Sequence, residues 1–323
     1  MTRVLSMMLI AVAMTVTADY ATAQSNYPEK PIRILVGFSA GSTVDVAARI
    51  LGQKLGEGVG KAVVIDNITG VAGNIAAERV AKAIPDGYTL ALAGNGQLVI
   101  NPSLYKLPYD TVKDFAPVSQ VYVSSNLLVV HNSVPAKNVR ELIALAKGRP
   151  GELTFASGGS GSSPHMAGEL LKSMAGIDMR HIPYKGVVSA LPDLIAGRVM
   201  MTIGPTSQVM AVVREGKLRA LAVTSLTRSA IFPDVPTIHE SGVPGYEASL
   251  WAGLLTPSGT PVAIVRRLHA ETVKALALRD VQARFADLGM DVIGNSPEEF
   301  SAIIKNEIPK WAKLVRELGI KAD

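Results

Sequence analysis

The sequence predicts an α/β protein of two domains, each with a mostly parallel sheet covered by helices. Its 323 residues are 48% apolar and 18% charged, which is typical of a globular chain long enough for about two domains. Short β-branched runs alternate with segments of helical periodicity, as parallel sheets with helices on both faces require. Two loops rich in glycine and serine each follow a predicted strand and precede a predicted helix.

The first part of the chain shows this alternation most clearly. Ile32-Arg33-Ile34-Leu35-Val36 is a short β-branched run that ends at Gly37, which predicts a buried strand. Apolar residues then recur at helical spacing over 44–55, and Pro85-Asp86-Gly87 stops a second helix. The predicted order is strand 32–36, helix 44–55, strand 62–66, helix 75–84 and strand 88–93.

The remainder of the chain continues the pattern. A long apolar stretch at 118–130 is interrupted by Ser124-Ser125-Asn126, and Pro164 suits the first turn of a helix. Further strands are predicted at 153–156, 179–182, 199–203, 218–223 and near 248–255. Further helices are predicted at 139–147, 164–175, 187–196, 207–215, 261–278, 281–288 and 297–318.

Charge and composition exclude several classes of partner and chemistry. The net charge is +5, but the basic residues are scattered and aromatic residues make up only 5% of the chain, so nucleic acid is not an expected partner. The absence of cysteine excludes disulfides, thiolate nucleophiles and thiolate metal sites. The five histidines include no pair spaced four residues apart and no H-E-x-x-H motif, so we expect no metal and no other cofactor.

The first 23 residues read as a secretory signal peptide. A short basic start, an apolar core over 4–16 and the ending Ala21-Thr22-Ala23 predict cleavage before Gln24. The alternative is an N-terminal membrane anchor, but the apolar core is shorter than the roughly 20 residues that span a bilayer. No later segment has 18 uninterrupted apolar residues. An exported chain without cysteine suggests a soluble protein of the bacterial periplasm.

The first glycine-serine loop, over 38–45, suits an anion at a helix start. Gly41 permits close approach of the backbone, and Ser42 and Thr43 can cap the helix or donate to a carboxylate. Helix N-termini at the carboxyl ends of parallel strands are ready anion sites. Asp45 has two interpretations: it complements the helix dipole, or it attracts a ligand ammonium.

The second loop holds three glycines and four serines between Ser157 and Ser163. Its hydroxyl and N–H groups could wrap a carboxylate, although a flexible surface turn is an alternative. A further alternative makes Ser160 or Ser163 a nucleophile with His165 as its base, but the G-x-S-x-G motif is absent and the geometry of one helix start is poor for proton transfer. Lys185 is either a solvated surface residue or a positive charge in the cleft.

Motifs spread in order along nearly the whole chain resemble one family. They include Pro85-Asp86-Gly87-Tyr88-Thr89-Leu90, Asn101-Pro102-Ser103-Leu104-Tyr105, Ser162-Ser163-Pro164-His165-Met166-Ala167-Gly168-Glu169, Pro183-Tyr184-Lys185-Gly186 and Pro233-Asp234-Val235-Pro236-Thr237. Each motif is weak alone, but together they are specific. They are similar to the Bug-type solute receptors, the extracytoplasmic binding proteins of tripartite tricarboxylate transporters.

The resemblance implies a type II-like periplasmic-binding-protein fold, with two mixed or parallel sheets flanked by helices and joined by a two-strand hinge. Domain 1 would comprise residues 24–122 and 228–323, and domain 2 residues 123–227. The family's ligands are mostly small organic acids, held between the two loops and their helix N-termini.

Carried over to this chain, the resemblance also implies a set of ligand-binding residues. They are Phe38, Ser39, Ala40, Gly41, Ser42 and Thr43, then Asn95 and Gln97, then Ser157, Gly159, Ser160, Gly161, Ser162, Ser163 and His165, and finally Lys185, Gly186, Pro205 and Thr206. Three departures from the family pattern stand out, of which Met200 in place of a frequent acidic residue is expected to leave binding unchanged. Ser42 stands where the family commonly has a second glycine. Gly204-Pro205-Thr206-Ser207 stands where an Asp-Asn pair is frequent, which disfavours a ligand ammonium.

Together these features predict a monomeric periplasmic solute-binding protein and not an enzyme. It would capture a mono- or dicarboxylate in an interdomain cleft and deliver it to the subunits of a membrane transporter. Two alternatives stay open at this point. One is a periplasmic sensor subunit that signals the presence of the ligand to a partner, and the other is a serine-dependent hydrolase.

Overall fold

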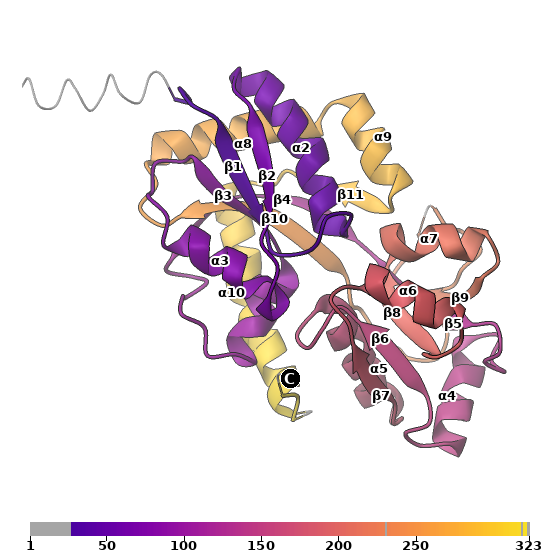
Figure 1. The fold of residues 1–323 in the computed structure, drawn as a ribbon. Helices are drawn as coiled ribbons and strands as arrows, with labels where there is room; N and C mark the ends of the chain where they lie inside the picture. The colour runs from indigo at the N-terminus through magenta and orange to yellow at the C-terminus, as the bar shows by residue number, and fades with distance from the viewer. Residues whose placement is uncertain (1–26, 230, 318, 322–323) are drawn as a thin grey trace, which may run out of the picture.

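The chain forms two lobes in the structure, a computed structural model that describes residues 27–229, 231–317 and 319–321 (Figure 1). Each lobe is a mixed sheet with helices on both faces, which confirms the predicted α/β class. The predicted signal peptide and its cleavage before Gln24 lie outside the described residues. Among the described residues, none of the helices has the length and hydrophobicity that crossing a bilayer requires.

The first lobe is built on a six-stranded sheet. Its strands are β1 (Ile32–Val36), β2 (Val63–Asn67), β3 (Thr89–Gly94), β4 (Phe115–Ser124), β10 (Leu250–Pro257) and β11 (Met290–Val292), in the order β11-β4-β10-β3-β1-β2. β1 is parallel to β2 and β3, as predicted, whereas β10 is antiparallel to both β3 and β4. The sequence did not predict β11, a short edge strand that pairs with β4.

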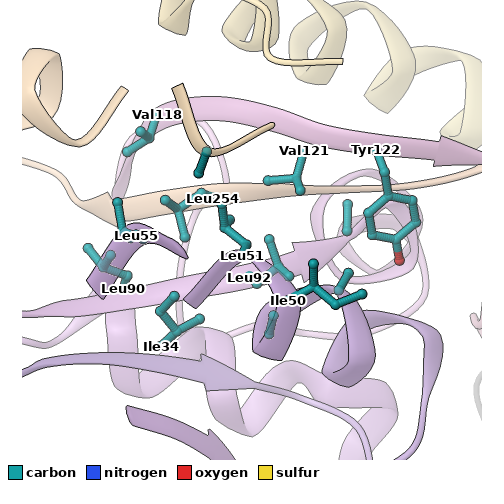
Figure 2. Close-up of a cluster of buried hydrophobic side chains, with 14 of the residues drawn as sticks. Ile34, Ile50, Leu51, Leu55, Leu90, Leu92, Val118, Val121, Tyr122 and Leu254 are labelled. Atoms are coloured by element: carbon teal, nitrogen blue, oxygen red, sulfur yellow. The ribbon is translucent and has the colours of Figure 1, made fainter. Parts of the chain in front are cut away.

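Helices cover both faces of this sheet (Figure 1). One face carries α2 (Thr43–Val59), α8 (Val262–Leu276) and α9 (Arg279–Asp287), and the other carries α3 (Asn74–Ala81) and α10 (Pro297–Glu317). Figure 2 shows the core beneath α2, where Ile34 and Leu92 of the sheet meet Leu51 of the helix. Leu35 and Ala91 point to the opposite core, because side chains alternate between the faces of a strand.

The second lobe is built on a five-stranded sheet. Its strands are β5 (Asn126–His131), β6 (Thr154–Ser157), β7 (Arg180–Pro183), β8 (Met201–Pro205) and β9 (Leu218–Val223), in the order β7-β6-β8-β5-β9. Its helices are α4 (Val139–Gly148) and α5 (Ser163–Ala175) on one face, and α6 (Val187–Ile195) and α7 (Thr206–Arg214) on the other. The short helical segments Val71–Gly73, Gly96–Ile100 and Asn101–Ser103 belong to the first lobe.

Two segments of the described chain cross between the lobes. The first is the step from β4 to β5 at Ser125, and the second joins β9 to β10. The crossings touch, because Ser125 Oγ donates to Ser225 Oγ at 2.9 Å. The domain boundaries at 122/123 and 227/228 stay predictions. The packing of Ile238 and Tyr246 in the second core favours a return to the first lobe nearer to Leu250.

The apolar stretch 118–130 forms two strands, one in each lobe, which divide at its Ser124-Ser125-Asn126 interruption. One predicted strand differs from the one observed. The strand predicted at 199–203 is β8, which begins at Met201 and includes Gly204 and Pro205. The strand starts later because the two preceding N–H groups bond outside the sheet ladder. The N–H of Val199 donates to Asp193 O at 3.3 Å, and the N–H of Met200 donates to Thr154 Oγ1 at 3.1 Å.

Candidate ligand-binding site

A cavity that opens to solvent lies between the lobes. Its walls come from the loop after β1 and the end of β3 in the first lobe, and from the starts of several helices in the second. Predicted residues that line it are Phe38, Ser39, Ser42, Thr43, Asn95, Ser162, Ser163, Lys185, Gly186 and Pro205. The fold therefore brings together residues from both glycine-serine loops, 120 or so positions apart in the chain.

Helix N-termini are the main feature of this cavity. In the described part of the chain, the starts of α2, α5, α6 and α7 all contribute lining residues. Each helix start leaves backbone N–H groups without intrahelical partners and carries a partial positive charge. The first two were expected from the glycine-serine loops. The other two follow β7 and β8 in the same strand-to-helix arrangement, which is the signal that could have revealed them.

Serine hydroxyls cap the two helices that follow the loops. Ser42 Oγ accepts from the N–H of Asp45 at 3.3 Å, and Ser162 Oγ accepts from the N–H of His165 at 3.4 Å. Both serines have the extended backbone of an N-cap. Since each oxygen accepts from the protein, its hydroxyl proton is available to donate to a ligand in the cavity.

Asp45 shapes the first loop instead of lining the cavity. Its carboxylate is buried and accepts from the N–H of Gly41 at 2.9 Å, from Arg49 Nε at 3.0 Å and from Asn67 Nδ2 at 2.9 Å. Asn67 Nδ2 also donates to Phe38 O at 2.9 Å. The end of β2 and the first turn of α2 thus hold the loop in place. Of the two interpretations of Asp45, the geometry supports the structural one.

These contacts give Asp45 a predictable effect on acid stability. Burial raises the pKa of its carboxyl, but hydrogen bonds from Arg49, Gly41 and Asn67 outweigh burial and hold the pKa below its ordinary value of 3.8. The stabilisation is therefore complete above that value and is lost as the pH falls through the lowered folded pKa. We expect Asp45→Asn to lose about 1 kcal/mol of unfolding free energy at neutral pH.

Urea unfolding across the acid range measures this effect. The difference between wild type and Asp45→Asn should begin to shrink near pH 3.8, where the carboxyl of the unfolded chain becomes protonated, and should be lost once the pH passes below the lowered pKa of the folded protein. A difference that stayed constant down to about pH 2 would show that the charge of Asp45 contributes nothing.

The second loop is held by histidines that lie behind it. Ser157 Oγ accepts from the N–H of Gly159 at 3.0 Å and contacts His181 Nε2 at 2.5 Å. The Nδ1 atom of His165 accepts from the N–H of Gly161 at 3.1 Å, and the ring stacks on that of His181 with centroids 4.1 Å apart. The buried ring of His165 thereby holds the loop in position. In the hydrolase alternative the same ring would have to accept the hydroxyl proton of Ser160 or Ser163.

The remaining predicted residues lie beside the cavity or behind it. Gly159 and Ser160 line an adjoining cavity, which shares Phe38, Ser39 and Lys185 with the first. Neither cavity is lined by Ala40, Gly41, Gln97, Ser157, Gly161, His165 or Thr206. The amide of Gln97, for example, donates to Gly73 O at 2.8 Å and accepts from the N–H of Gly94 at 3.1 Å.

Several lining residues were not predicted. They are Val44, Ala72, Gly94, Gly96, Gly158, Pro164, Val187, Val188, Gln208 and Leu250. Most are apolar or glycine, so they carry no chemical signal in the sequence. Among the described residues that line the two cavities, Lys185 is the one charged side chain, and Asp and Glu are absent. The described ranges also hold no cluster of three or more His, Cys, Asp or Glu residues suited to a metal ion.

Known proteins share both the sequence and the fold. Residues 47–320 match the model of the tripartite tricarboxylate transporter family receptor. Protein BugT of Bordetella pertussis is 37% identical over 99% of both chains. The structure of R. palustris Rpa4515 with adipate is 36% identical, with a TM-score of 0.88 over 91% of this chain and 99% of that one. MatC from Rhodopseudomonas palustris with bound malate is 32% identical, with a TM-score of 0.84 over 90% and 100%. The chain therefore belongs to the receptor family of the tripartite tricarboxylate transporters, as its motifs predicted.

Proposed function

We propose that this protein is a periplasmic receptor that captures a small organic carboxylate between its lobes and delivers it to a membrane transporter. One observation carries the proposal: in the described residues, the N-termini of α2, α5, α6 and α7 meet at one cavity that no Asp or Glu lines. Such a cavity offers hydrogen-bond donors and positive potential to an anion. The similar proteins with adipate and with malate support the same ligand class.

The expected affinity follows from the donors available. A hydrogen bond to a charged group contributes about 1.5–3 kcal/mol, and a helix start contributes about 0.3–2 kcal/mol. Backbone N–H groups and the hydroxyls of Ser42 and Ser162 supply four or five such bonds at about these magnitudes. After the costs of ordering the ligand and closing the lobes, we expect about −8 kcal/mol, which corresponds to a Kd of about 1 μM.

Titration calorimetry with a panel of organic acids tests this proposal. Ser42→Ala and Ser162→Ala should each weaken binding by about 10- to 100-fold, because each removes one donor to the carboxylate. Asn138→Ala is a matched control. Asn138 caps α4 by accepting from the N–H of Glu141 at 2.9 Å, and it is not among the described residues that line the cavity. All three variants should lose about 1 kcal/mol of stability, but Asn138→Ala should bind normally. Equal binding by all three would contradict the site.

The alternatives predict different results. A hydrolase would turn over an ester or amide substrate and lose that activity in His165→Ala, but the contact of His165 Nδ1 with Gly161 disfavours this role. Transport and signalling differ in the partner. If uptake of a labelled acid ligand requires the receptor gene, delivery is supported, whereas intact uptake with lost gene induction would indicate a sensor.

Export and oligomeric state belong to the same proposal. We expect the protein purified from the periplasm to begin at Gln24 and to scatter light as a monomer. N-terminal sequencing and light scattering of the purified protein check both expectations.

A further inference from the structure

The cavity between the lobes has a polar end. A Cβ atom built on Gly158 would lie 3.5 Å from Gly186 Cα and 3.6 Å from Ser162 Oγ, and one built on Gly186 would lie 3.9 Å from Ser39 Oγ. These distances place both glycine-serine loops and the start of α6 around one point. Hydroxyl and N–H donors from both lobes gather there, which suits a single carboxylate.

Much of the remaining lining is apolar. This part, which we call the apolar wall, comprises Val44, Val187, Val188, Pro205 and Leu250, which come from both lobes. A wall of this kind favours a ligand with an apolar body, because burying apolar surface costs no hydration free energy and is favourable. A second carboxylate placed against it would lose its hydration and gain no partner in return.

Polar side chains near this apolar wall already have partners. Thr43 Oγ1 bonds to Ser207 Oγ at 2.8 Å and accepts from Gln208 Nε2 at 3.0 Å. Asn95 donates to Ser249 O and accepts from the N–H of Gly96, both at 3.1 Å. The donors that these groups still offer to a second carboxylate are therefore uncharged, at most the second amide N–H of Gln208 and that of Asn95.

The charges around the cavity agree with this division. Lys185, the one charged side chain among the described lining residues, lines both cavities together with Phe38 and Ser39 of the first loop. There it adds to the attraction for the first carboxylate. The described lining offers neither a second cation at the apolar wall nor an acidic group for a ligand ammonium.

We infer that the preferred ligand is a monocarboxylate with an uncharged, apolar body, and not a dicarboxylate or an amino acid. This inference rests on the proposed carboxylate-binding function and narrows it. The carboxylate binds at the helix starts and the body packs on the apolar wall. The related structures with adipate and malate hold dicarboxylates, so this chain differs from them in ligand class.

Matched pairs of acids test the inference by calorimetry on the full mature protein. In each pair a methyl group replaces the second carboxylate: butanoate with succinate, hexanoate with adipate, and 4-methylbenzoate with terephthalate. Because of the desolvation of the second carboxylate, the monocarboxylate of the best-binding pair should bind at least about tenfold more tightly than its partner. Glutamate should bind more weakly than either member of that pair.

A designed cation provides a second test. Val188 lies in the first turn of α6 and is 45% exposed, so Val188→Lys should fold. It should strengthen binding of the dicarboxylate of that pair by at least about fivefold and weaken that of the monocarboxylate. Val262→Lys is the matched control, since Val262 is also an exposed valine in the first turn of a helix, α8, and does not line the cavity. It should change neither affinity.

The outcomes separate the two proposals. A dicarboxylate or glutamate that binds as tightly as the monocarboxylate, or a Val188→Lys variant with unchanged preference, would overturn this inference and leave the carboxylate receptor standing. Failure of every acid to bind at millimolar concentration would overturn the proposed function as well.

Discussion

Gly161→Ala is expected to reduce ligand affinity at least about 100-fold, because the added methyl group would prevent the lobes from meeting. Gly161 lies in the second loop, and a Cβ atom there would be 2.4 Å from Asn101 Oδ1 and 2.9 Å from Leu104 Cδ1. Both neighbours belong to the first lobe. Asn101 cannot easily withdraw, because it is fully buried and donates to Asn74 Oδ1 at 2.7 Å. The contact must therefore be relieved by moving the lobes apart.

A control is needed because Gly161 also has a positive φ of 80°. Alanine in this region costs about 1–2 kcal/mol whatever its surroundings. Gly216 has a φ of 69°, and no described heavy atom lies within 4 Å of its Cβ position. Gly216→Ala should therefore lose a similar amount of stability in urea unfolding but bind normally in calorimetry. Small-angle X-ray scattering should find Gly161→Ala more extended in the presence of ligand. Normal binding by Gly161→Ala would mean that recognition does not need this closure.

The elements next to the site were predictable because their signals are local. The β-branched run of β1, the serine caps of α2 and α5 and the proline in the first turn of α5 act within a few residues. Each is sufficient to define where a strand ends and a helix begins. Once the alternation predicts parallel strands, the carboxyl ends of those strands and the helix starts after them must share one edge of a sheet.

Features that depend on distant contacts were not predictable in the same way. The family resemblance implied Gln97 at the ligand, but its amide donates to Gly73 O and accepts from the N–H of Gly94. The sequence left two roles open for Asp45, attraction of a ligand ammonium or support of the helix start. The hydrogen bond from Asn67 on β2 favours the structural role. Residues between β9 and β10 show no periodicity, and their position on the second lobe depends on contacts such as Tyr246 OH to Ala167 O.

The apolar wall of the cavity illustrates the same limit. Val44, Val187 and Leu250 are indistinguishable in the sequence from core residues, since burial is the ordinary state of such side chains. Their place in the cavity follows from the packing of the two lobes, which brings together residues from α2, α6 and β10. In the proposed site the polar loop residues bind the anion, whereas ligand selectivity depends on apolar positions that only the tertiary structure reveals.

Gly168→Ala is expected to destabilise the protein by about 2 kcal/mol, although alanine is the better helix former. Gly168 faces the sheet from α5, and a Cβ atom there would lie 2.3 Å from Phe155 Cε2. The ring of Phe155 is fully buried on β6 and is flanked by the rings of His165 and His181, with centroids 6.4 Å and 5.0 Å away. Because the ring is buried between these two histidines, we expect α5 to move away from β6 to relieve the contact.

Gly148→Ala separates this clash from helix propensity. Gly148 is the last residue of α4, and no described heavy atom lies within 4 Å of its Cβ position. This variant should be unchanged or gain up to about 1 kcal/mol. Urea midpoints at constant m-value measure both effects. Because Phe155 lies two residues before Ser157, displacement of α5 also disturbs the second loop, so Gly168→Ala should bind its acid less tightly even where it is fully folded. Equal stability of the two variants would mean that the aromatic cluster has room to repack and does not fix the loop.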